Sequence, residues 1–499
     1  MECQMPAKRI LSAALALLLV AAIPARATTP PTFTVIDSIR PGADSSYALD
    51  LARGAVLGDY LYFHANDGTT GDELWRTNGT TTELVKDINP GAGGSDAYYF
   101  TEFGSYLYFI ADDGSTGDEL WRTNGTEAGT TRVADINPGA STSYPADLQV
   151  FGEYLYLGAD DGTNGYELWR TNGTTTELAE DIVIGSGSSF VDHLTPLGSY
   201  LYFSAYDETR GRELWRTNGT TATLVSDIQP GGDGSFPSGF TALGTYLYFQ
   251  ANDGTNGEEL WRTNGTTTEL VKDINPGAGG SDAYYFTEFG SYLYFIADDG
   301  TTGDEVWRTN GTEAGTTRVA DIDPVPGASS DPRNFTIFGD YLYFEADDGA
   351  TGDEVWRTNG TTTEMVGDID VGSGNSNPEA FTPFGDFLYF IADNGDQDYV
   401  WRTNGTVIEQ VPFPDAGQYV NCDCYDTALV ALGGRLFSTV YSEATGNEFA
   451  YLNEPTDVLP ETNRDGGVNS AWAIALSALA LVTLAAGVGL RRRAGAAQR

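Results

Sequence analysis

The sequence predicts an all-β protein made of one four-stranded unit repeated around a ring. A tryptophan in the string ELWRTNG, or a close variant, returns every 45 to 49 residues, and each period holds four short runs rich in aromatic and β-branched residues. The eight tryptophans are Trp75, Trp121, Trp169, Trp215, Trp261, Trp307, Trp356 and Trp401. A period of about 46 residues with four strands matches one blade of a β-propeller, whose apolar faces only neighbouring blades can bury.

The strands of one unit follow from its runs and turns. They are FTEF from Phe100, YLYFIA from Tyr106, ELWRT from Glu119 and TRVADI from Thr131. Short glycine-containing turns separate them, and Asn-Gly after each ELWRT is the strongest local signal of a tight hairpin. We therefore expect four antiparallel strands per blade.

The two ends of the repeat region predict how the ring closes. Residues 34–39 match the outer strand of a unit, but the other three strands of that unit do not precede them. Residues 428–452 match a divergent unit that lacks its fourth strand. Pairing of Phe33–Ile39 with Glu448–Leu452 would complete this unit and remove two exposed sheet edges. The count is then nine blades, and an eight-bladed ring with an appended hairpin is the alternative.

The N-terminus has the pattern of a secretory signal peptide. Lys8 and Arg9 precede an apolar run over residues 10–23, and Ala25-Arg26-Ala27 forms a small-x-small cleavage site. We expect residues 1–27 to be removed.

The C-terminus has the pattern of a membrane anchor. Residues 471–490 carry no charge and can span a bilayer as a transmembrane helix, and the basic tail 491–499 is expected in the cytoplasm. The propeller domain, 28–452, is then exported and held at the cell surface. The linker 453–470 contains LPETN, which resembles the LPxT sorting signal of sortases, but Asn463 replaces the usual glycine. Membrane anchoring is therefore favoured over transfer to the cell wall.

The charge excludes one class of partner. The formal net charge is −45, and it becomes about −47 without the signal peptide, which carries three basic residues and one acidic residue. Phosphate binding needs a basic surface, so nucleic acid is excluded. Such a surface is soluble and self-repelling, and we expect a monomer.

The repeated strings at residues 119–130 (ELWRTNGTEAGT) and 305–316 (EVWRTNGTEAGT) resemble the ELWxxDGTxxGT, or hyalin-like, repeat of bacterial surface proteins. The resemblance covers residues 33–452. This chain has Asn in place of Asp in every copy and shortens the second half to GTTTEL in most. The resemblance implies an exported, repeat-built surface protein, and it implies no reaction and no catalytic residues.

Acidic loops between the second and third strands are candidate calcium sites, because they gather carboxylate oxygens. The candidates are Asp112, Asp113, Asp118, Asp298, Asp299 and Asp304. Their spacing does not match an EF-hand. The alternative is that these aspartates cap backbone N–H groups of polar turns, and it leaves the protein without a cofactor.

Two further repeated positions suggest ion pairs. Every ELWRT-type string has an arginine, and seven outer strands carry an aspartate at one position. We expect Arg–Asp pairs within or between blades. The arginines are Arg76, Arg122, Arg170, Arg216, Arg262, Arg308, Arg357 and Arg402, and the aspartates are Asp87, Asp135, Asp181, Asp227, Asp273, Asp321 and Asp368.

Residues that break the repeat are the candidates for chemistry done once per molecule. His64 and His193 stand at variable positions, 129 residues apart, with no serine or cysteine motif beside them, and we interpret both as satisfied or exposed histidines. Arg210 and Arg212 lie in an otherwise acidic loop and could recognise a carboxylate. Cys422 and Cys424 are expected to form a local disulfide outside the cell.

These patterns favour a non-catalytic surface protein used for adhesion or ligand binding. The partner is an extracellular ligand, either a glycan or a matrix protein. The alternative is an extracellular polysaccharide hydrolase or lyase, because a fold does not decide function. An enzyme should bring irregular carboxylates or histidines together near the centre, whereas a scaffold should show rings of equivalent side chains.

Overall fold

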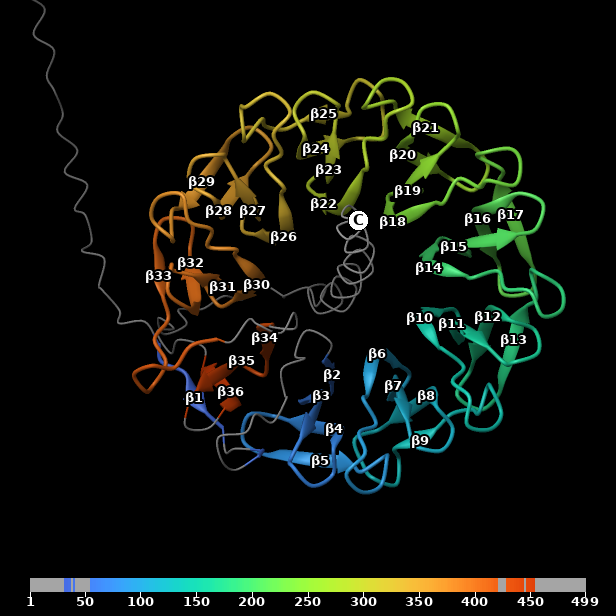
Figure 1. Cartoon of the computed structure of the whole chain (residues 1–499), viewed down its shortest axis with the longest axis horizontal. Coiled ribbons are helices and arrows are strands. Elements are labelled where there is room, and N and C mark those ends of the chain that lie inside the picture. Colours follow the sequence, from blue (N-terminus) through green and yellow to red (C-terminus); the bar gives the residue numbers. More distant parts are fainter. Residues whose placement is uncertain (1–30, 37–38, 41–53, 421–427, 444–445, 454–499) are drawn as a thin grey trace, which may run out of the picture.

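The computed structural model describes residues 31–36, 39–40, 54–420, 428–443 and 446–453, and every regular element in these ranges is a β-strand. The strands form nine four-stranded antiparallel sheets arranged as the blades of one ring (Figure 1). The prediction of nine four-stranded blades is confirmed, and the eight-bladed alternative is wrong.

Each blade begins next to the centre of the ring (Figure 1). The inner strands are β2 (Ala55–Leu57), β6 (Tyr98–Phe103), β10 (Ala146–Phe151), β14 (Asp192–Leu197), β18 (Ser238–Leu243), β22 (Tyr284–Phe289), β26 (Arg333–Phe338), β30 (Glu379–Phe384) and β34 (Val430–Leu432). The second strands are β3 (Tyr60–Asn66), β7 (Tyr106–Asp112), β11 (Tyr154–Asp160), β15 (Tyr200–Asp207), β19 (Tyr246–Asn252), β23 (Tyr292–Asp298), β27 (Tyr341–Asp347), β31 (Phe387–Asp393) and β35 (Arg435–Ser442).

The outer half of each blade holds the tryptophan strand and the edge strand. The third strands are β4 (Asp72–Thr77), β8 (Asp118–Thr123), β12 (Tyr166–Thr171), β16 (Gly211–Thr217), β20 (Glu258–Thr263), β24 (Asp304–Thr309), β28 (Asp353–Thr358), β32 (Asp398–Thr403) and β36 (Gly446–Asn453). The outer strands are β5 (Thr82–Lys86), β9 (Thr131–Arg132), β13 (Thr176–Glu180), β17 (Ala222–Ser226), β21 (Thr268–Lys272), β25 (Thr317–Arg318), β29 (Thr363–Gly367), β33 (Ile408–Gln410) and β1 (Thr34–Val35). We number the blades 1 to 9 from β2 to β34.

Blade 9 is built from both ends of the repeat region. Strand β1 pairs antiparallel with β36, with Thr34 opposite Tyr451, and the Ile36 N–H donates to the Phe449 carbonyl at 2.8 Å. Phe33, only 2% exposed, packs into the core between blades 8 and 9. The predicted closure by the N-terminal strand is confirmed.

The hydrophobic core lies between blades rather than in one centre. Each of nine clusters of buried side chains joins two neighbouring blades. Trp121, for example, packs with Tyr62 and Leu74 of the preceding blade, and Trp75 packs with Phe437 of blade 9. The repeated tryptophans are therefore structural, and each blade depends on its neighbours for burial.

The expected Arg–Asp pairing of the ELWRT arginines is wrong. Where the outer strand offers a glutamate, the arginine pairs with it, as Arg170 does with Glu177 at 2.6 Å, because these two residues face each other in the β12–β13 register. Its guanidinium also lies 4.3 Å from the centroid of the Tyr154 ring and donates to the Gly219 carbonyl of the next blade. The arginine thus joins two strands and two blades.

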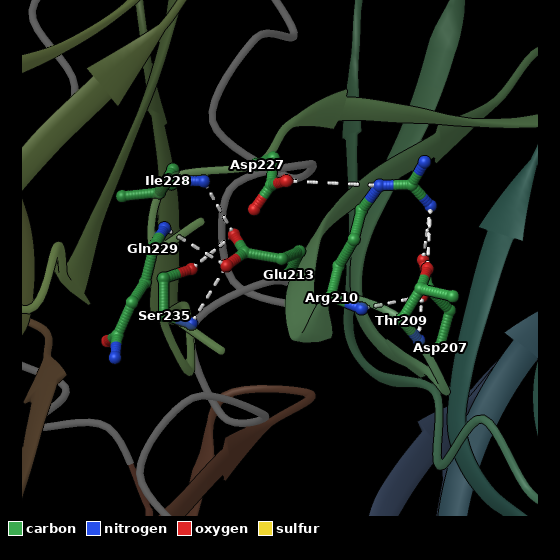
Figure 2. Close-up of polar contacts among 8 residues, drawn as sticks. All are labelled: Asp207, Thr209, Arg210, Glu213, Asp227, Ile228, Gln229 and Ser235. Atoms are coloured by element: carbon green, nitrogen blue, oxygen red, sulfur yellow. Dashed lines mark hydrogen bonds and ion pairs between the residues drawn. The ribbon is translucent and has the colours of Figure 1, made fainter. Parts of the chain in front are cut away.

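A link is the segment that runs from the outer strand of one blade to the inner strand of the next. In blades 1 to 7, a buried glutamate of the third strand holds the link that follows. Glu213 is fully buried, and Figure 2 shows its carboxylate accepting the N–H groups of Ile228, Gln229 and Ser235 and the Ser235 hydroxyl at 2.6–3.1 Å. Burial raises the pKa of Glu213, and the Ser235 hydrogen bond opposes the shift. Six other fully buried glutamates accept from their own links: Glu73, Glu119, Glu167, Glu259, Glu305 and Glu354.

Some predictions fall on residues that the structure does not describe. The signal peptide 1–27, the transmembrane segment 471–490 and the pair Cys422 and Cys424 lie outside the described residues. Among the residues that are described, no helix is long and apolar enough to cross a membrane.

Deletion of residues 28–40 should destabilise the ring strongly. The deletion exposes the edge of β36 and removes Phe33 from its core, and loss of one buried phenylalanine side chain alone costs about 3–5 kcal/mol. The measurement is the melting temperature by scanning calorimetry. Ile36→Pro, which removes the hydrogen bond to Phe449, should reproduce part of the loss of stability. Ile36→Ala keeps the backbone N–H and this hydrogen bond, so it should destabilise the ring less than Ile36→Pro. An unchanged melting temperature after the deletion would contradict closure.

Glu213→Gln should destabilise the protein by about 1–3 kcal/mol, because an amide NH₂ then faces N–H donors and leaves a buried donor without an acceptor. Glu208, exposed in the β15–β16 loop, provides the matched control. Glu208→Gln should leave the melting temperature within error of the wild type. Equal melting temperatures for the two variants would refute the capping role of the buried glutamate.

Candidate functional site

The links and the turns between second and third strands lie on one face of the ring, which we call the link face. At the start of each of blades 2 to 8, two positions on this face adopt left-handed backbone conformations. The residue after the link serine has φ of 42° to 50° in Asp96, Tyr144, Phe190, Phe236, Asp282, Asp331 and Asn377. The second residue of the inner strand has φ of 54° to 65° in Tyr99, Asp147, His193, Gly239, Tyr285, Asn334 and Ala380. The bulge at the start of each of these strands requires the second conformation.

Three consecutive links place an aromatic residue in this conformation. Tyr144, Phe190 and Phe236 are 66%, 54% and 57% exposed, and we call them the aromatic arc. A left-handed conformation costs a bulky residue about 1–2 kcal/mol, whereas Asp and Asn adopt it more readily. The four other links use Asp or Asn at this position. The arc is therefore both strained and poorly buried.

An open cavity of about 320 Å³ lies beside the arc, between blades 3 and 4. Asp147 and Tyr166 come from blade 3, Asp192 and Arg212 come from blade 4, and Phe190 comes from the link between them. The Phe190 and Tyr166 rings are stacked, with centroids 6.4 Å apart and an angle of 20° between their planes. The cavity combines an exposed ring face with a group of polar side chains.

Two aspartates form a hydrogen-bonded pair in this cavity. Burial raises the pKa of Asp147 to about 8, and the hydrogen bond to Asp192 and the charge of Asp192 add to the shift. The His193 N–H contacts both carboxyl groups, because it donates to Asp147 Oδ2 at 2.5 Å and to Asp192 Oδ1 at 2.9 Å. At neutral pH, the pair therefore keeps one shared proton, so that one carboxyl group can donate a hydrogen bond to the other.

Arg212 and Tyr166 complete the polar wall. Burial lowers the pKa of Arg212, which nonetheless stays cationic, and its charge faces Asp192. Tyr166 has room because blade 3 carries Gly158 on the neighbouring strand, where a Cβ would collide with the Tyr166 hydroxyl. The cavity thus presents a carboxyl, a carboxylate, a guanidinium and a phenol beside an aromatic face.

Of the residues that break the repeat, some lie far apart in the structure and others lie at the cavity. His64 lies in blade 1 and His193 in blade 4, so the two histidines do not form a site. The His193 ring packs at 5.8 Å from Phe240, and burial lowers its pKa. Arg212 reaches the cavity, whereas Arg210 instead pairs with Asp207 at 2.8 Å and with Asp227 at 3.9 Å (Figure 2).

The acidic loops use their aspartates within their own turns. Asp113 Oδ1 accepts the N–H and hydroxyl groups of Ser115 and Thr116 at 2.7–3.0 Å, and Asp112 accepts the Gly114 N–H. Asp298 and Asp299 repeat the arrangement in blade 6. Burial raises the pKa of Asp118, and it raises that of Asp304 to about 6. No three acidic, histidine or cysteine side chains are grouped for a metal within the described ranges, and calcium binding stays a prediction.

Blade 7 has a different group of polar residues at the positions that correspond to the cavity of blade 3. Burial raises the pKa of Glu345 to about 8, and Arg333 opposes the shift. Asn334 donates to Glu345 at 3.0 Å and to the Pro378 carbonyl at 3.1 Å. These side chains bond to one another, and the neighbouring link carries Asn377 where blade 4 has Phe190.

Sequence reasoning missed Asp147, Asp192, Tyr166 and the arc. A signal was available, because Gly158 and Tyr166 depart from the repeat together, and the residue after the link serine changes from acidic to aromatic. That these residues meet depends on how blades 3 and 4 face each other, which the repeat pattern alone does not specify.

Asp147→Asn should weaken the pH dependence of stability. The folded pKa of Asp147 is raised, so its protonated form contributes stability below the unfolded value of about 3.8, and this contribution is lost as pH rises towards 8. Asparagine can donate to Asp192 and accept from His193 at any pH. The melting temperature of the variant minus that of the wild type should therefore increase between pH 5 and 8 and level off above pH 8. In the control Asp161→Asn, this difference should be constant, because hydrogen bonds from Asn164 and Thr163 outweigh burial and lower the pKa of Asp161. A constant difference for Asp147→Asn as well would contradict the protonated pair.

No protein-family model matches the chain, and no curated protein sequence matches it. Among solved structures, prolyl endopeptidases share 14% identity over 69% of this chain and 54% of theirs, with a TM-score of 0.39. A puromycin-hydrolyzing peptidase of Mycobacterium tuberculosis shares 12% identity over 83% of this chain and 61% of its own, with a TM-score of 0.39. Oligopeptidase B from Trypanosoma brucei shares 12% identity over 70% and 53%, with a TM-score of 0.37. The chain spans between about half and three-fifths of the length of these peptidases, and similarity at this level carries no activity over to it.

Proposed function

We propose that this chain is a non-catalytic, cell-surface propeller whose link face binds an extracellular ligand, as an adhesion or ligand-binding protein. Export rests on the signal-like residues 1–27, and anchoring rests on the apolar segment 471–490 with its basic tail.

The observation that carries this proposal is the contrast between the two faces of the ring. On the face opposite the links, blades 1 to 8 all end their third strand in the same Thr-Asn-Gly turn. On the link face, the residue three places before the tryptophan is Asp in five of these eight blades, whereas it is Tyr166, Arg212 and Glu258 in blades 3 to 5. A uniform framework that carries varied side chains on one face is suited to selective binding.

The same cavity is also where an enzyme would act, since Asp147, Asp192 and His193 lie together. The geometry disfavours glycoside hydrolysis, because the two carboxyl groups are hydrogen-bonded to each other. Glycosidases hold their two carboxyl groups about 5 Å or more apart, so that the sugar or a water molecule fits between them. We therefore prefer binding to hydrolysis.

The test is a screen of the full-length protein on immobilised glycans and extracellular-matrix proteins. For each hit, Arg212→Ala should weaken binding at least tenfold, because the variant removes a charged donor from the cavity. Glu153→Ala, in the exposed β10–β11 turn on the opposite face, is the control and should bind like the wild type. Absence of any hit, or equal binding by both variants, would overturn the proposal. Release of new reducing ends from a bound polysaccharide would favour the enzyme instead.

A further inference from the structure

Neither burial nor backbone conformation explains the aromatic arc. Tyr144, Phe190 and Phe236 each leave more than half of their surface in water, so they gain little from burial. They also occupy a left-handed conformation that four equivalent links give to Asp or Asn. Aromatic residues on three neighbouring links are thus both exposed to water and held in an unfavourable backbone conformation. This combination indicates a surface that a ligand covers.

The rings lie along three neighbouring blades. Figure 1 places β10, β14 and β18 side by side around the centre, these inner strands contact one another, and each arc residue precedes one of them by two residues. The middle ring, Phe190, is also part of the wall of the cavity. One aromatic residue is therefore available per blade, and the central one stands beside hydrogen-bond donors and acceptors.

This combination matches the chemistry of a sugar chain. A pyranose ring has an apolar face of C–H groups, which packs on an aromatic face, and an edge of hydroxyl groups, which needs hydrogen-bond partners. We propose that the aromatic arc and the cavity bind a neutral polysaccharide, with sugar units on Tyr144, Phe190 and Phe236 and hydroxyl groups of the central unit bonded to Asp147, Asp192 and Arg212. This assignment rests on the proposed function of the link face as a binding surface.

Charge and spacing select a neutral glycan over other ligands. Asp96 and Asp282 occupy the arc position in the links on either side, and the net charge of −45 repels polyanions. A peptide bound through consecutive apolar side chains would suit a continuous apolar groove, whereas here each ring belongs to a different blade and polar side chains lie between them. Because several sugar units bind at once, affinity should rise with chain length.

The experiment measures retardation of the full-length protein, in detergent, during native electrophoresis through gels that contain a neutral β-glucan, a neutral mannan or alginate as the acidic arm. A peptide array provides the protein arm. We expect retardation by a neutral polysaccharide, weakened at least tenfold by Phe190→Asn and retained by Phe190→Trp. The triple variant with asparagine at 144, 190 and 236 should abolish it. Asp282→Asn, at the same position in another link, should have no effect.

Melting temperatures separate binding from folding. Asparagine suits the left-handed backbone, so Phe190→Asn should melt at or above the wild-type temperature while it loses binding. Retardation by a neutral glycan that the triple variant retains would overturn the assignment. Binding only to alginate or only to peptides, if lost in the link-face variants, would overturn the assignment to a neutral glycan and leave the proposed function standing. Binding in no arm and in no screen would overturn both.

Discussion

The buried glutamate in the third strand of blades 1 to 7 is the interaction on which the link face depends. Glu213 satisfies three backbone N–H groups and one hydroxyl of its link, and these donors would otherwise be buried without partners. The first N–H of the link that bonds to the glutamate lies 15 residues after Glu213 and 17 residues after Glu119. The blade of Glu119 has the longer GTEAGT hairpin, so the extra residues lie between the glutamate and the link and leave the contact unchanged. The links are thus held alike in blades whose outer strands differ, and adjacent positions are free to vary.

Closure of the ring depends on the same framework, used in an altered form. In blade 9, Tyr451 takes the arginine position of the third strand and Arg435 takes the tyrosine position of the second strand. The guanidinium still lies over the ring, at 4.7 Å, and still reaches the next blade, where it donates to the Asn78 carbonyl. The exchange keeps the cation–π contact and the bond between blades at the point where the two ends of the repeat region meet.

The sequence predicted what repeats and failed where residues from different blades meet. Strand number, order and closure follow from periodicity and turn chemistry, so nine blades and the role of Phe33 could be anticipated. The partner of Arg76 was misassigned to an aspartate because the hairpin register, which sets Arg76 opposite Glu83, was not followed through. The cavity could not be predicted, because Asp147 and Asp192 are 45 residues apart and meet only when blades 3 and 4 pack.

The two halves of the ring show how one framework gives different chemistry. Residues 73–136 and 259–322 are nearly identical, so blades 1 and 2 repeat in blades 5 and 6, while blades 3 and 4 diverge from blades 7 and 8. Where blades 3 and 4 carry Asp147 and Phe190, blades 7 and 8 carry Asn334, bonded to Glu345 of β27, and Asn377 on the link between them. The same backbone positions therefore give an open cavity on one side and a self-satisfied polar cluster on the other. Side chains at these positions differ while the backbone of the ring stays the same, so the irregular blades are where selective binding is to be sought.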